Sequence, residues 1–201
     1  MSKYVKFTYQ RARADIASFD ALAELNAFRR KLVDQHLSGV YPNGVGFGNV
    51  SVRDGRTTSF YITGSATGGL AELTSTDCVR VVAYDFARNC LSYEGTAVPS
   101  SESLTHAAIY ESDSITSAVI HCHESALWAM LLDRVPTTSK AVAYGTPEMA
   151  YEIIRLFQIS DVRNAKIFVM AGHQDGIVTF GKNFEEAFQV LMRVKRNIAL
   201  H

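Results

Sequence analysis

Residues 118–123 read AVIHCH, and this short apolar run, taken from Ser117, predicts a β-strand. Along a strand, residues two apart point to the same face, so His121 and His123 project together. Two imidazoles on one face supply half of a Zn²⁺ or similar divalent site, and a third protein ligand completes a catalytic site with one open position. Taken alone, the pattern is more often a surface strand with two hydrogen-bonded histidines, so it needs support from elsewhere in the chain.

Helices and further strands are predicted on both sides of this strand. Helical spacing of apolar residues, helix-start signals and β-branched runs set their limits. The expected helices span Phe19–His36, Ser101–Ser112, Glu124–Leu132, Thr146–Phe157 and Asn183–Leu200. The expected strands span Gly48–Arg53 and Ser59–Thr63, joined as a hairpin around Asp54-Gly55, then Val79–Phe86, Lys166–Met170 and Ile177–Phe180. Because these elements follow no regular βαβ rhythm, we expect an α/β fold with a mixed or largely antiparallel sheet covered by helices.

Composition predicts a single domain over residues 1–201 and excludes some partners. The chain has 201 residues, 47% of them hydrophobic and 20% charged, without a Pro-, Gly- or Ser-rich linker. Lys plus Arg and Asp plus Glu number 20 each, so the net charge is zero, and neither nucleic acid nor an acidic membrane surface is an expected partner. No apolar run reaches the roughly 18 residues of a membrane span, and none follows the charged N-terminus as in a secretory signal. Three cysteines, an odd number without paired spacing, fit a reducing compartment, so we expect a cytoplasmic protein.

Further polar side chains are candidates to complete the site begun by the two histidines. His173 lies in the loop AGHQDG, where glycines let the backbone turn and bring an imidazole to a cleft, although a loop histidine is more often a polar turn residue. Glu102, His106 and Tyr110 are spaced four apart on a predicted helix and therefore share one face.

Three segments of small residues are candidates for an anion site: PSS at 99–101, GNVS at 48–51 and ITGSATGG at 62–69. Ser100 and Ser101 either cap the helix that follows or, with the free N–H groups there, attract a phosphate or carboxylate. The two glycine-containing loops either wrap an anion with backbone N–H groups or are ordinary turns.

Taken together and in this order, six strings resemble the class II aldolase/adducin family over about residues 22–191. They are GNVSVR (48–53), YITGSATGG (61–69), PSSESLTHAAIY (99–110), AVIHCH (118–123), YGTPEMA (144–150) and GHQDGIVTFG (172–181). The resemblance implies a three-layer α/β/α sandwich around a mixed, mainly antiparallel sheet. It also implies a homotetramer with active sites at the subunit interfaces.

The resemblance further implies the roles of individual residues. One zinc ion per chain is held by His121, His123, His173 and, at rest, Glu102, which is also the acid/base. The implied substrate- and phosphate-binding residues are Asn49, Thr63, Gly64, Ser65, Thr67, Gly68, Ser100 and Ser101.

The implied function is that of a divalent-metal-dependent lyase of the class II aldolase type. The metal polarises a keto/hydroxy substrate and stabilises an enediolate, while Glu102 shuttles the proton. The substrate is a small carbohydrate with a phosphate or carboxylate. The family's sugar-phosphate aldolases carry a tyrosine proton donor after the HxH strand, but here that segment is short and its only tyrosine, Tyr144, does not align with the donor. A metal-dependent dehydratase of a ketose phosphate and a non-enzymatic, adducin-like interaction module therefore stay open as alternatives.

Overall fold

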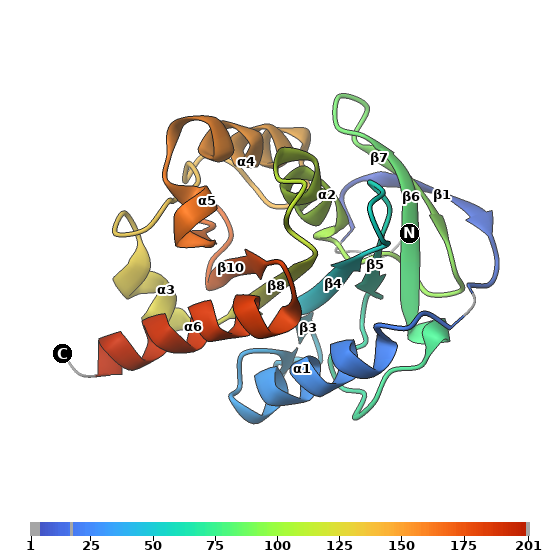
Figure 1. The fold of residues 1–201 in the computed structure, drawn as a ribbon, viewed down its shortest axis with the longest axis horizontal. Helices are drawn as coiled ribbons and strands as arrows, with labels where there is room; N and C mark the ends of the chain where they lie inside the picture. Colours follow the sequence, from blue (N-terminus) through green and yellow to red (C-terminus); the bar gives the residue numbers. More distant parts are fainter. Residues whose placement is uncertain (1–4, 17, 200–201) are drawn as a thin grey trace.

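The computed structural model describes residues 5–16 and 18–199, and its centre is a mixed sheet of eight strands (Figure 1). The strands lie in the order β1-β7-β6-β5-β4-β8-β10-β9. Neighbouring strands are antiparallel, except that β1 pairs with β7 in parallel. Their bounds are β1 Thr8–Arg13, β4 Asn49–Arg53, β5 Phe60–Thr63, β6 Cys78–Asp85, β7 Cys90–Glu94, β8 Ala118–His123, β9 Ile167–Val169 and β10 Gly176–Gly181.

Helices cover both faces of this sheet and make two separate apolar cores. On one face, α2 (Ser103–Ser112) and α4 (Pro147–Ile159) pack on the strands, with the short α5 (Val162–Ala165) beside them. On the other face lie α1 (Leu22–Asp34), α3 (Ser125–Leu131) and α6 (Phe184–Ala199). The expected α/β/α sandwich around a mainly antiparallel sheet is therefore confirmed.

Strand β8 lies within the sheet, between β4 and β10, and divides its side chains between the two layers. Ala118, Ile120 and Cys122 are fully buried in the core under α1 and α6. Val119 belongs to the opposite core, under α2 and α4. Because side chains alternate along a strand, His121 and His123 lie on the Val119 face, where α2 begins.

Several short elements were not predicted from the sequence. The edge strand β1 carries mostly exposed side chains, so it lacks the apolar alternation by which a strand is recognised, and its pairing with β7 holds it in place. Strands β2 (Gly39–Val40) and β3 (Gly46–Phe47) form a separate two-stranded hairpin, and a 3-10 turn spans Ser75–Asp77.

The predicted helices and strands occur near their expected places, with shifted ends. Helix α1 begins at Leu22 and ends at Asp34, shortly before the left-handed backbone of His36. Helix α2 begins at Ser103, because the chain before it turns through Ser100. The last residue of the closing predicted helix, Leu200, lies outside the described residues. Within the described chain, the helices are too short or too polar to span a membrane.

Candidate active site

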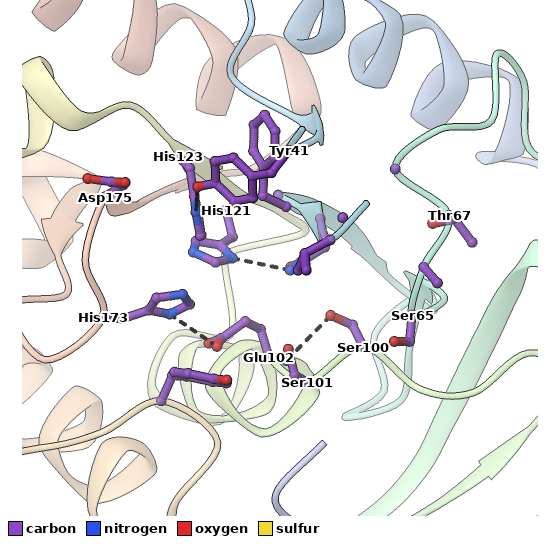
Figure 2. A pocket seen from close by; sticks show the side chains of 18 of the residues that line it. Tyr41, Ser65, Thr67, Ser100, Ser101, Glu102, His121, His123, His173 and Asp175 are labelled. Atoms are coloured by element: carbon purple, nitrogen blue, oxygen red, sulfur yellow. Dashed lines mark hydrogen bonds and ion pairs between the residues drawn. The ribbon is translucent and has the colours of Figure 1, made fainter. Parts of the chain in front are cut away.

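Three histidines meet at the C-terminal end of β8, a strand within the sheet. His121 and His123 end β8, and His173 comes from the loop between β9 and β10. The centres of their rings are 4.8 to 5.1 Å apart. One nitrogen from each lies within 4.8 Å of the others, a spacing that suits one shared cation. Figure 2 shows the three rings facing a common space beside Glu102.

The strand opposite His123 leaves room for this cluster. Gly176 of β10 pairs with His123 in the ladder, and the added methyl of an alanine there would stand 3.3 Å from Nε2 of His121 and 3.3 Å from the His173 ring. A side chain at this position would therefore crowd the space between the histidines.

Each histidine of β8 uses one ring nitrogen in a hydrogen bond and leaves the other in the cluster. Nδ1 of His121 is 3.1 Å from Nδ2 of Asn49, and Nδ1 of His123 is 2.8 Å from Oη of Tyr41. Both Nε2 atoms are buried without a hydrogen-bond partner among the described residues. Buried nitrogens left unpaired are costly unless something fills the space between them. The residues present therefore fit a divalent cation.

Glu102 lies at the N-terminal end of α2 and is 1% exposed. Its Oε1 is 3.3 Å from Nδ1 of His173, and its Oε2 accepts a hydrogen bond of 2.7 Å from Thr105. Burial alone would raise the pKa of this carboxyl, but His173 and Thr105 outweigh that effect and place the pKa below its ordinary value. Glu102 is therefore a carboxylate at neutral pH, ready to ligate a cation or accept a proton.

The histidines of β8 stay neutral to well below physiological pH. Burial, reinforced by the neighbouring imidazoles, lowers the pKa of His121 well below its ordinary value. Burial and His173 lower the pKa of His123 to about 4. Because an imidazole must be neutral to bind a metal, both rings are already in the competent form.

The histidines and Glu102 lie at one side of a pocket of about 620 Å³ (Figure 2). The other side is lined by the hydroxyl-bearing and glycine residues of the loop after β5 and by the serines before α2. The sequence-predicted residues that line the pocket are Asn49, Gly64, Ser65, Thr67, Gly68, Ser100, Ser101, Glu102, His121, His123 and His173. Thr63 does not line it, because it is buried in β5, where its hydroxyl accepts a hydrogen bond from the Val50 amide.

Arg29 of α1 fixes the backbone of the glycine-containing loop after β5. Its guanidinium donates hydrogen bonds to the carbonyls of Thr67 (2.8 Å) and Gly68 (3.1 Å). Gly68 also touches the β2–β3 hairpin so closely that an added methyl would lie 2.2 Å from the carbonyl oxygen of Gly39. The loop is thus fixed between α1 and the hairpin, with its Ser65 and Thr67 side facing the pocket.

Beneath Glu102, a buried polar network joins β4 to α2. The Ser51 hydroxyl lies 2.7 Å from Nδ1 of His106 and 2.7 Å from Oη of Tyr110. Burial lowers the pKa of His106 to about 4, so this ring is neutral as well. His106 and Tyr110 therefore support the helix that begins after Glu102. This agrees with the prediction that the three residues, spaced four apart, share one face of that helix.

Residues 42–201 match the family model described as "Class II Aldolase and Adducin N-terminal domain". The chain belongs to the class II aldolase and adducin family. The family resemblance inferred from the six sequence strings is therefore confirmed.

Solved structures of class II aldolases share this fold. An L-fuculose 1-phosphate aldolase is 25% identical in sequence, with a TM-score of 0.68 over 90% of this chain and 84% of that chain. The L-fuculose-1-phosphate aldolase of Thermus thermophilus is 19% identical, with a TM-score of 0.62 over 89% of this chain and 92% of that chain. A sugar-phosphate aldolase of Thermotoga maritima is 16% identical, with a TM-score of 0.63 over 90% of this chain and 96% of that chain. A comparison with curated protein sequences finds no significant match.

In this class II aldolase family member, several pocket residues were not predicted as site residues, among them Tyr41, Phe47, Asp175 and Tyr144. Tyr41 and Phe47 come from the hairpin, whose YPNG stretch indicates only a turn. Asp175 follows His173 in a left-handed conformation. The Tyr144 ring is 4.5 Å from that of His173, and Nζ of Lys6 lies 3.7 Å from the centre of the Tyr144 ring. Asp175 and Tyr144 lie in the strings GHQDGIVTFG and YGTPEMA, which pointed to the family without indicating a place in the pocket.

Proposed function

We propose that the protein is a divalent-metal-dependent lyase of the class II aldolase type, acting on a small phosphorylated or carboxylated keto/hydroxy carbohydrate. The observation that carries this proposal is the meeting of three imidazoles and a buried carboxylate at one side of a pocket. Family membership and the likeness to L-fuculose 1-phosphate aldolase support it.

His121, His123, His173 and, at rest, Glu102 would hold the cation, and three nitrogens with one oxygen are a donor set that suits zinc. When bound, such a cation acts as a Lewis acid that stabilises negative charge on a substrate oxygen. The four groups already lie together, so little reorganisation of the chain is needed to bind it.

Glu102 is proposed as the acid/base. Its lowered pKa makes it a carboxylate at neutral pH, and Thr105 holds one of its oxygens in place. The other oxygen, Oε1, lacks a hydrogen-bond partner within the described chain and faces His173. Oε1 can remove a proton from the carbon next to the substrate's carbonyl and return it later in the reaction.

The far side of the pocket is proposed to bind the substrate's anionic group. Hydroxyls of Ser65, Thr67, Ser100 and Ser101 line this side, together with the backbone of Gly64 and Gly68. Ser100 also accepts a 3.4 Å hydrogen bond from the Glu102 amide, just before the first turn of α2, while both Ser100 and Ser101 line the pocket. An anion held at this side fixes the reacting carbons near Glu102, which converts binding energy into orientation.

A dehydratase of a ketose phosphate is the second candidate, because it needs the same metal and carboxylate. The family's sugar-phosphate aldolases use a tyrosine proton donor in the segment after the HxH strand. Here the segment after α3 is short, and Tyr144, its only tyrosine between residues 133 and 144, does not align with that donor, which favours dehydration over cleavage. A non-enzymatic module is less well supported, because binding a protein partner does not require the complete set of donor groups. Cleavage and dehydration are distinguished by their products in a screen of ketose phosphates and hydroxy-keto acids.

Two measurements test the proposal. Elemental analysis of protein purified without added metal should find about one divalent ion per chain. Glu102→Gln should keep most of the metal but lower proton exchange and turnover by about 10²- to 10⁴-fold, whereas the exposed Glu148→Gln serves as the control. Protein that takes up no zinc at neutral pH, or normal turnover by the Glu102 variant, would contradict the proposal. The homotetramer with interfacial sites stays a prediction, and sedimentation at micromolar concentration tests it.

A further inference from the structure

Tyr41 lies on the β2–β3 hairpin and reaches the histidine cluster from outside. Its Oη is 2.8 Å from Nδ1 of His123, a residue 82 positions later in the chain. Its ring packs on Phe47 with the centres 4.3 Å apart, and Phe47 in turn lies 5.8 Å from the His123 ring. The aromatic stack therefore fixes the position of the hydroxyl independently of the hydrogen bond.

A neutral imidazole carries one proton, and the two possible tautomers differ in cost at His123. If Tyr41 donated to Nδ1, the His123 proton would lie on Nε2, which is buried among imidazoles without a hydrogen-bond partner in the described structure. If Nδ1–H instead donates to Tyr41 Oη, Nε2 presents a lone pair to the space shared with His121 and His173. Only the second tautomer places a metal-binding electron pair in the cluster.

The same arrangement recurs at His121. Asn49 is its direct neighbour across β4 and β8, and the Asn49 amide contacts Nδ1 of His121. Oδ1 of Asn49 is buried and lacks a partner in the part of the chain described. Turning the amide by 180° pairs this oxygen with Nδ1–H of His121 and leaves Nε2 as a lone pair. Two histidines of one strand thus each have an oxygen available behind the ring.

We propose that Tyr41 is a positioning residue for the cation site, accepting the Nδ1–H of His123 and so presetting its Nε2 as a ligand. This inference rests on the proposed metal-dependent function. Outer partners of this kind fix the tautomer and orientation of a ligating histidine, and their loss lowers metal affinity about 10- to 100-fold. Tyr41 acts through His123 and needs no contact with the substrate.

Tyr41→Phe tests the proposal because it removes only the hydroxyl and keeps the ring on Phe47. Titration of metal-free protein with zinc against a chromophoric chelator should show a dissociation constant about 10- to 100-fold higher than that of the wild type. Tyr151→Phe, which removes a tyrosine hydroxyl from the exposed side of α4, should bind zinc as the wild type does. Equal affinity in Tyr41→Phe and the wild type would overturn the proposal.

A second measurement uses the metal-free protein. Long-range ¹⁵N–¹H correlation spectra of histidine-labelled protein should show the proton of His123 on Nδ1 in the wild type. In Tyr41→Phe, part of the population should carry it on Nε2, and an unchanged tautomer would count against the role of Tyr41. If the wild type itself binds no zinc, the proposed function fails, while the tautomer measurement still decides whether Tyr41 orients His123.

Discussion

Ser51→Ala should destabilise the protein strongly, because one hydroxyl serves two buried groups. Ser51 is fully buried in β4, and its Oγ is 2.7 Å from both Nδ1 of His106 and Oη of Tyr110 on α2. Both partners are themselves buried, at 0% and 1% exposure, so water does not replace the lost hydroxyl.

The expected cost follows from the two groups left behind. A buried polar group without a partner costs about 1–3 kcal/mol, so two such groups cost about 2–6 kcal/mol. That loss is a large fraction of the roughly 5–15 kcal/mol by which domains are stable. It also loosens the contact between β4 and the helix that carries Glu102.

Urea denaturation measures the effect, as a lower midpoint with an unchanged slope. Thr179→Val is the matched control, because the buried Thr179 hydroxyl has no hydrogen-bond partner within the described chain and valine keeps its shape. That variant should be neutral or slightly stabilised, since it removes an unsatisfied group. A cost below about 1 kcal/mol for Ser51→Ala, or equal costs for both variants, would refute the reasoning.

Two other perturbations have defined outcomes. Gly68→Ala should destabilise by about 1–3 kcal/mol in urea denaturation, because its methyl would overlap the Gly39 carbonyl. Gly69→Ala should cost less, because its methyl would meet only the exposed Val40 side chain, at 3.2 Å; equal costs would contradict this. The pKa of His106 and His123, about 4 when folded, lies below the value of about 6.5 in an unfolded chain. The unfolded state therefore binds more protons below pH 6.5. The free energy of unfolding of the metal-free protein should therefore fall by on the order of 2 kcal/mol per histidine between pH 6.5 and about pH 5. An unfolding free energy that does not change over this pH range would argue against buried neutral rings.

The fold was largely predictable where local pattern and tertiary burial agree. The run AVIHCH alternates between two cores and becomes β8, and the helical spacing at Leu25, Phe28 and Leu32 becomes the buried face of α1. Strand β1 was missed because its residues are polar and exposed, so that only its pairing with β7 identifies it.

The residue types of the candidate site were predictable from the sequence, but the residues that hold them in place were not. The order of the six strings placed the three histidines and Glu102 together through resemblance to a family. Contacts such as Tyr41 with His123 and Arg29 with Thr67 join residues 82 and 38 positions apart, and no local spacing encodes them. Thr63 was expected to bind the substrate's anionic group through the family resemblance, but it lies at the end of β5 and is 3% exposed.

The cross-strand pairing of Asn49 with His121 ties the chemistry of the cluster to the alignment of the sheet. Because side chains alternate along a strand, a slip of β4 by one residue would turn Asn49 to the opposite layer and bring Val50 against the imidazole. Such a misaligned chain would retain most of its secondary structure and yet lose the partner of a ligand. On the proposed metal site, metal uptake during refolding would therefore report correct strand alignment with more discrimination than circular dichroism.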